Sequence, residues 1–246
     1  MGVRWTSFVI PVSLLAIWEV TSRAGVIDTG AFSMPSAIVL AGWQATMSGE
    51  VLVRTWQTLE AAVYGMAVAT VVGVAVGVFL GFQPYFEKMS RILFEIARAI
   101  PAIALMPLAL LVYGFGINME ASIVAYACVW PIIIAAMAAT RNIDTRLLEV
   151  AAVLEMKPAR RYFSIILPAV FARVMVGVRT AIGFALVVSV TIEILANPRG
   201  LGYGLIIAQQ SFNTPLMYAY LFWLALVGLA INEISKLGSN FSERGN

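Results

Sequence analysis

Apolar residues follow one another in long runs along this chain, without the regular polar positions of half-buried helices and strands. About 20 mostly apolar residues are enough for a helix to cross the hydrocarbon core of a bilayer. Six runs approach this length, and they cover about residues 6–20, 60–82, 99–115, 121–139, 176–196 and 216–231. The pattern therefore predicts an all-α, polytopic membrane protein whose first span is short and whose six-helix region continues to about residue 231.

The composition agrees with a membrane protein and excludes several kinds of chemistry. Of the 246 residues, 61% are hydrophobic and 12% charged, whereas a soluble domain is about 45–50% apolar. No repeat or low-complexity linker divides the chain, so a single transmembrane domain is expected over residues 1–246. There is no His and only one Cys, which excludes His-based metal sites, Ser-His triads and disulfides. We expect no catalytic residue and no metal site.

Positive charges gather on one side of the predicted membrane. With the N-terminus inside, the cytoplasmic side receives Arg4, Lys88, Arg91, Arg98, Arg141, Arg146, Lys157, Arg160, Arg161, Lys236 and Arg244. The outside receives only Arg23, Arg54 and Arg199. The positive-inside rule thus predicts that both termini are cytoplasmic, and it explains the net charge of +3 without a nucleic-acid partner. The first span is interpreted as an uncleaved anchor because Glu19 and Arg23 follow it; a cleaved signal peptide is the alternative.

The second predicted span carries Gly73, Gly77 and Gly81 at four-residue spacing. This spacing places the three small residues on one helix face, where another helix can approach closely. Alternatively, these glycines reflect only the high frequency of Gly in membrane helices. Neither interpretation specifies a function.

A charged segment, residues 141–168, separates the fourth and fifth predicted spans. Asp144 is expected to cap a helix over residues 145–156, which ends before Pro158 because the residue preceding a proline disfavours the helical conformation. Small and apolar residues recur on one face of this helix: Leu147, Leu148, Ala151, Ala152 and Leu154. Two interpretations stay open: an amphipathic helix on the membrane surface, or a helix that docks into a groove of a partner protein.

This charged segment resembles the EAA loop of ABC importer permeases. Glu149 and Ala151 occupy the first and third positions of that motif, and Ile165, Leu167 and Pro168 follow at the matching distances. One departure is Glu155, which stands where the motif has a glycine. Because glycine permits a tight turn there, we expect the turn to shift toward Lys157 and Pro158 in this chain.

Other segments resemble the nitrate/sulfonate/taurine-type branch of these permeases in the same order along the chain. They are Met-Pro-Ser at 34–36, RAIPAIALMPL at 98–108, Gly-Val-Arg at 177–179 and EILANPRGLGY at 193–203. The branch often has an arginine where this chain has Ala61. The resemblance covers almost the whole chain and implies the fold of a type I ABC importer permease in a bacterial-type cytoplasmic membrane.

The resemblance also implies partners. A second permease subunit would complete the pathway, most simply a second copy, although a heterodimer stays open. Two ATPase subunits would bind the coupling loop, and an extracytoplasmic binding protein would deliver the solute. The chain has no glycine-rich phosphate-binding loop, so ATP and Mg would lie on the ATPase subunits and no cofactor on this chain. The implied coupling residues are Asp144, Arg146, Glu149, Ala151, Ala152, Glu155, Lys157, Pro158, Leu167 and Pro168.

The expected translocation pathway or gate has fewer landmarks. Its candidate residues are Pro101, Pro107, Arg179, Glu193, Gly200 and Gly202. An acid inside a span, such as Glu193, suggests function by default, but a structural carboxylate paired with Arg179 or with backbone donors is the alternative. Arg179 would attract an anion or extend toward lipid headgroups. Gly200 and its neighbours are expected to form a flexible outer turn.

The substrate implied by the resemblance is a small organic or inorganic anion, such as a sulfonate, taurine, nitrate or bicarbonate. The same group also serves aromatic acids and thiamine-precursor or flavin-like compounds. A secondary transporter or channel that works without an ATPase is the competing function, although no pair of interrupted half-helices indicates an inverted repeat. An intramembrane enzyme is disfavoured, because the only Asp residues, Asp28 and Asp144, lie in predicted loops.

Overall fold

The computed structural model describes residues 6–25, 30–143 and 145–243, and every element in these ranges is helical. In chain order the elements are α1 Thr6–Arg23, α2 Pro35–Met47, α3 Glu50–Phe82, α4 Pro84–Ala99, η1 Ala102–Leu105, α5 Met106–Tyr113, α6 Ile117–Arg141, α7 Thr145–Val153, α8 Pro158–Arg161, η2 Tyr162–Ile166, α9 Leu167–Leu195, α10 Gly200–Gln210 and α11 Thr214–Glu243. Here η1 is a 3₁₀-helix and η2 a π-helix. The all-α prediction is confirmed.

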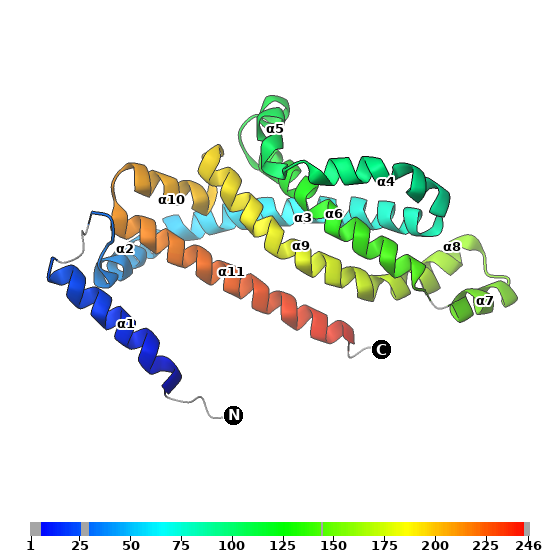
Figure 1. Ribbon diagram of the computed structural model, residues 1–246, viewed down its shortest axis with the longest axis horizontal. Helices are drawn as coiled ribbons and strands as arrows, with labels where there is room; N and C mark the ends of the chain where they lie inside the picture. The colour runs from blue at the N-terminus through cyan, green and yellow to red at the C-terminus, as the bar shows by residue number, and fades with distance from the viewer. Residues whose placement is uncertain (1–5, 26–29, 144, 244–246) are drawn as a thin grey trace.

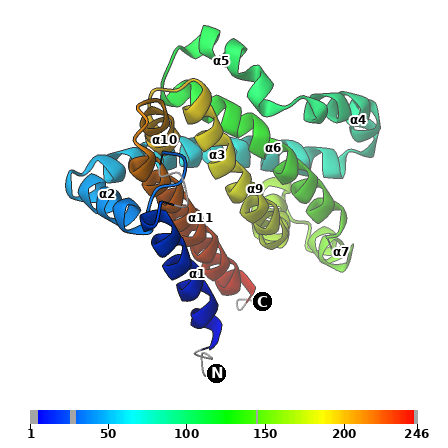
Figure 2. The ribbon, with the colours of Figure 1, turned by 60° about the vertical axis from the view of Figure 1, so that its left-hand side comes forward.

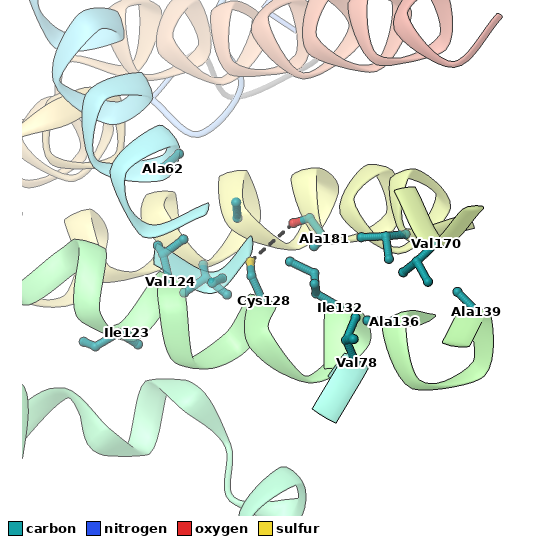
Figure 3. Packing of buried hydrophobic residues seen from close by; sticks show 14 of the residues in the cluster. Ala62, Val78, Ile123, Val124, Cys128, Ile132, Ala136, Ala139, Val170 and Ala181 are labelled. Atoms are coloured by element: carbon teal, nitrogen blue, oxygen red, sulfur yellow. Dashed lines mark hydrogen bonds between the residues drawn. The ribbon is translucent and has the colours of Figure 1, made fainter. Parts of the chain in front are cut away.

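Three long helices, α3, α6 and α9, pack together along the long axis of the molecule (Figure 1). Their shared core is built from small and β-branched side chains, among them Val124, Ile132, Ala136 and Val170 (Figure 3). Helices α7 and α8 lie at one end of this axis, called here the α7 end, and α2 and α10 lie at the other, called the α10 end (Figure 1). The fold therefore holds the charged loop and the expected gate at opposite ends of one bundle.

The glycine face of α3 packs directly against α6. A Cβ atom added at Gly73 would lie 2.8 Å from Ile132 Cγ2, and one added at Gly77 would lie 2.6 Å from Ala136 Cβ. Gly81 meets α6 in the same way, because its added Cβ would lie 2.6 Å from the Cβ of Thr140. Such distances leave no room for a side chain, so the close-packing interpretation of this spacing is confirmed.

Four of the described helices are long and apolar enough to cross a membrane, or up to five if α4 and the η1–α5 segment count as one bent span. The prediction of six spans is therefore confirmed only in part. Helix α1 is not among them, because polar residues such as Glu19 and Arg23 lie at its end. Figure 2 shows α1 meeting the start of α11, where the Trp18 and Tyr218 rings lie 6.3 Å apart.

The third predicted span, residues 99–115, is wrong in detail. The chain forms the helix α4 before it, bends by 84° and continues through η1 into α5. The bend has a local cause: Ile100 precedes Pro101 and adopts an extended conformation with ψ 120°, as a residue before proline prefers. Residues 84–98, expected to be a cytoplasmic connection, instead form a helix beside α6 (Figure 1).

Candidate coupling loop and gate

Helix α7 displays part of the predicted coupling surface. Arg146, Glu149 and Ala152 are exposed, and so are Glu155 and Lys157 in the turn that follows. Ala151 is the exception, since it is buried against the rest of the chain. Two apolar side chains next to these residues also face solvent: Val153 is 82% exposed and Leu154 is 66% exposed. Asp144 and the side chains of Leu147 and Leu148 lie outside the described residues.

The turn after α7 is centred on Glu155, so the expected shift toward Lys157 and Pro158 is wrong. The Met156 N–H donates to the Ala151 carbonyl at 3.1 Å, and the Glu155 N–H donates to the Ala152 carbonyl at 3.0 Å. These two bonds form a Schellman motif, whose turning residue is left-handed. Glu155 has φ +46°, so a glutamate adopts the conformation that the motif glycine normally supplies. The two backbone bonds hold the turn in place, and α7 ends at Val153 rather than at Met156.

Beyond this turn the chain runs into α9 almost without interruption. Pro158 begins α8, as expected for a proline in a first helical turn, and the π-helix η2 joins α8 to α9. Leu167 and Pro168 form the first turn of α9. The candidate coupling loop is therefore linked by helical backbone to a helix that reaches the opposite end of the molecule (Figure 1).

At the α10 end, three side chains cap the N-terminus of α10. The Gly200 N–H donates to Gln57 Oε1 at 2.9 Å, and the Leu201 N–H donates to Thr58 Oγ1 at 2.9 Å. The Gly202 N–H donates to Glu193 Oε2 at 2.7 Å. Gln57 and Thr58 come from α3 and Glu193 from α9, so the cap joins three helices and satisfies backbone donors that a helix start leaves unpaired.

Gly200 is required at the first position of α10 for two reasons. Its φ is +82°, a backbone conformation that residues other than glycine rarely adopt. In addition, a Cβ added there would lie 1.8 Å from Glu193 Oε1. The expectation of a flexible outer turn at residues 200–204 is therefore wrong. These residues are the first turn of a helix, and the glycines let that turn approach the carboxylate.

A second buried acid, Glu120, lies in the same region. Its Oε2 accepts a 2.7 Å hydrogen bond from Asn197 Nδ2, and Asn197 Oδ1 accepts one from the Gly116 N–H at 3.1 Å. Glu120 and Glu193 are each 1% exposed and are close enough to interact electrostatically. The sequence interpretation missed Glu120 because it started the fourth span at residue 121, whereas α6 begins at Ile117. A span start only four residues earlier would have placed this acid inside the membrane segment.

The remaining pathway candidates lie away from this cluster. Arg179 is an exposed residue of α9, about 21 Å from Glu193 along the helix at 1.5 Å per residue. Pro101 lies at the bend after α4, and Pro107 lies in the first turn of α5. The structure thus brings together Glu193, Gly200 and Gly202 but not the other three. Within the described ranges, no three His, Cys, Asp or Glu side chains are grouped to hold a metal ion.

Comparison with known protein families assigns residues 69–244 to a family described as the binding-protein-dependent transport system inner membrane component. The chain belongs to this family. It is the permease subunit of a binding-protein-dependent ABC importer, in which separate partner subunits hydrolyse ATP. This membership decides against a secondary transporter or channel that works without an ATPase.

Curated relatives are similar to this permease over most of its length. It is 28% identical over 228 residues to a putative aliphatic sulfonates transport permease protein, SsuC, of Bacillus subtilis, covering 93% of this chain and 83% of the relative. It is 31% identical to the riboflavin transport system permease protein RibX of Chloroflexus aurantiacus, covering 95% of this chain and 88% of that protein. Among solved structures, an inward-facing MetNI methionine ABC transporter matches with a TM-score of 0.68 at 19% identity, covering 78% of this chain and 96% of that one. The fold is therefore that of ABC transporter permeases.

Proposed function

We propose that two copies of this permease form the translocation pathway of a type I importer for a small organic or inorganic anion. The full arrangement has six spans, counting α1 and the bent α4–α5 pair, and places both termini and the α7 end in the cytoplasm. Lys88, Arg146, Lys157, Arg160 and Arg161 belong to the α7 end and its neighbouring turns, which supports this orientation. An extracytoplasmic binding protein delivers the solute at the α10 end.

The α7 segment is the coupling surface for the ATPase in this proposal. It presents a carboxylate, Glu149, beside two exposed apolar side chains, Val153 and Leu154. A helix that rested on the membrane would have these apolar residues in lipid and few acidic residues beside them. A short helix closed by backbone bonds at Glu155 instead suits a preformed groove in another protein, where little ordering is needed on binding.

One observation carries the link between ATPase and gate: α9 touches both ends of the molecule. Its first turn follows the coupling loop directly, and Glu193 in its last turns caps α10. Its 29 residues extend about 43 Å at 1.5 Å per residue. Displacement of the loop by the ATPase would move α9 relative to α3, and Gly200 and Leu201 would then separate from Gln57 and Thr58. In this mechanism the gate is the cap that α3 and α9 form on α10. Closure of the ATPase subunits on ATP shifts the equilibrium between the intact and the separated state of this cap.

An anionic substrate is supported by the names of the relatives, which include permeases for aliphatic sulfonates, bicarbonate and nitrate. Another relative is named for riboflavin, a larger and mostly uncharged ring system. Identity to each of these lies between 24% and 31%, so the names define a range of solutes rather than one compound. Within that range we propose a small anion as the substrate.

The deciding experiment is co-purification of the tagged permease with its ATPase in mild detergent, with mass spectrometry of the bound proteins. Glu149→Lys should remove the ATPase and leave membrane insertion intact, because it reverses a charge on the exposed coupling face. Glu233→Lys is the matched control, since Glu233 is an exposed acid on α11. Equal ATPase recovery with the two variants and the unmodified chain would refute the coupling assignment.

A further inference from the structure

A cavity of about 370 Å³ lies between α4 and α6, with Leu80 of α3 at its edge. This volume falls in the range that holds small organic ligands. Helix α4 turns its charged residues toward the cavity, including Arg91, Glu95 and Arg98. Its opposite face is apolar and exposed, with Met89, Ile92 and Ile96 pointing away from the bundle. A membrane helix with its polar face turned inward needs something polar to occupy the space that it faces.

The cavity is lined by two carboxylates and two arginines, but one of the carboxylates is paired with a third arginine that does not line it. Glu87 forms an ion pair with Arg141 of α6, and Glu95 pairs with Arg91 at 3.1 Å. Arg98 has no ion pair or side-chain hydrogen bond to any other described residue. Because both carboxylates that line the cavity already have an arginine partner, Arg98 leaves one positive charge in excess.

Arg98 lies in the last turn of α4, far from the start of the helix. It is about 21 Å from Pro84 along α4 at 1.5 Å per residue, so it lies beside the middle of α6 rather than near the α7 end. An arginine at such depth in a membrane protein is costly unless it faces water, protein donors or an anion. The guanidinium carries five N–H donors in a planar fork that matches a carboxylate, sulfonate or phosphate group.

The remaining walls of the cavity are apolar and aromatic. The rings of Phe94 and Trp130 lie edge to face at 5.8 Å, and Tyr126 packs against Trp130 at 5.6 Å. The Tyr126 hydroxyl donates to the Ala97 carbonyl, which holds the end of α4 against α6. Ile134 and Met137 complete the apolar side. The cavity thus combines one unpaired cation with a preformed aromatic and aliphatic wall.

We infer that the cavity between α4 and α6 binds a monovalent organic anion that carries an apolar group, with Arg98 holding the anionic head and Phe94 and Trp130 contacting the apolar part. The same chemistry is offered by a transported organic anion and by the headgroup and upper chain of an anionic lipid. If the ligand is the transported solute, the inference rests on the proposed function. The site itself requires only the residues of this chain.

The test uses the full chain alone, in phosphatidylcholine nanodiscs, with butane-1-sulfonate as the probe and isothermal titration calorimetry as the readout. We expect saturable binding that weakens at least tenfold in Arg98→Gln and largely returns in Arg98→Lys. Butyl methyl sulfone, a neutral analogue of similar size, should bind at least tenfold more weakly. A second arm extracts the chain from membranes that contain phosphatidylglycerol and measures the retained lipid by native mass spectrometry.

Ile134→Trp keeps Arg98 and fills the cavity, so it should abolish binding as well. Val71→Trp is its control, because Val71 is an exposed residue on α3 outside the cavity. Arg98-dependent sulfonate binding identifies a solute site, and Arg98-dependent phosphatidylglycerol retention identifies a lipid site. The inference is overturned if neither ligand depends on Arg98, or if Val71→Trp reduces binding as much as Ile134→Trp. No ATPase is present in this assay, so its failure would leave the co-purification result unaffected.

Discussion

Glu193 of α9 accepts a hydrogen bond from the backbone N–H of Gly202 in the first turn of α10, at 2.7 Å. Both groups are buried, and the same helix start is held by Gln57 and Thr58 from α3. A contact that joins three helices through a few hydrogen bonds can be released by a small displacement of any one of them.

Glu193→Ala should destabilise the permease, whereas Glu193→Gln should fold and assemble normally. The alanine leaves the Gly202 N–H buried without an acceptor, which costs about 1–3 kcal/mol, whereas the glutamine oxygen can still accept that bond. Thermal unfolding in detergent measures the difference. We expect Glu193→Gln to change ATP hydrolysis by the reconstituted complex more than it changes ATPase recovery. If both variants unfold alike, the carboxylate is required for structure and the gate role of Glu193 is wrong.

Gly77→Ala should destabilise the permease by about 1–3 kcal/mol, the usual cost of forcing extra atoms into a packed interior. The added Cβ would lie 2.6 Å from both Ala136 Cβ and the Ile133 carbonyl oxygen. Gly183→Ala is the control, because an added Cβ there has nothing within 4 Å. That change should be neutral or stabilising, since alanine favours a helix over glycine by about 1 kcal/mol. Similar unfolding temperatures for the two variants would contradict the close packing of α3 on α6.

Glu155→Gly should stabilise the turn after α7 by about 0.5–1 kcal/mol. Glutamate at φ +46° has a left-handed conformation that costs about 1–2 kcal/mol, and glycine removes most of this cost despite its greater backbone freedom. Hydrogen exchange of the α7 amides should slow accordingly. Glu149→Gly, inside the same helix, should speed exchange instead. Faster exchange in Glu155→Gly would show that the glutamate side chain stabilises the turn through contacts of its own.

Glu19→Ala should detach α1 from the rest of the chain. The Glu19 carboxylate accepts hydrogen bonds from the Ser36 N–H at 3.0 Å and the Ser36 hydroxyl at 2.7 Å, and so caps the start of α2. Limited proteolysis between α1 and α2 should therefore be faster. Arg23→Gln is the control, since it removes only the ion pair on α1 and keeps both bonds to Ser36. Equal cleavage rates for Glu19→Ala and Arg23→Gln would contradict the cap.

The sequence was sufficient where one local rule decides the structure. Four-residue glycine spacing correctly predicted the α3 face that meets another helix, which is α6. It was insufficient where tertiary contacts decide. Gly200 to Gly204 are typical of a turn, but side chains from α3 and α9 satisfy their backbone donors and make a helix start stable. Similarly, no local signal showed that α4 turns back along α6.

The residues of the proposed coupling surface are easier to group from the sequence than those of the proposed gate, for a related reason. The proposed coupling residues all lie within residues 144–168, so their spacing along the sequence is enough to group them. The residues of the proposed gate come from α3, α9 and α10, with Glu120 of α6 beside them, and only the fold brings them together. Glu120 was hidden by an uncertain helix boundary, and Gln57 and Thr58 were ordinary polar residues in the sequence. Their role follows only from where α10 begins.

The close glycine contacts of the bundle also determine which helices are free to move. Gly65, Gly73, Gly77 and Gly81 pack α3 closely against α6 at four levels, which opposes sliding of one helix past the other. The glycines of α9 give one such contact with α6, at Gly177, where an added Cβ would lie 2.5 Å from Ala135 Cβ. Leu167 and Glu193 are about 15 Å and about 24 Å from Gly177 along the helix at 1.5 Å per residue. We therefore expect α9 to pivot at Gly177 like a lever with unequal arms, so that a displacement at the coupling loop grows by about 1.6-fold at Glu193.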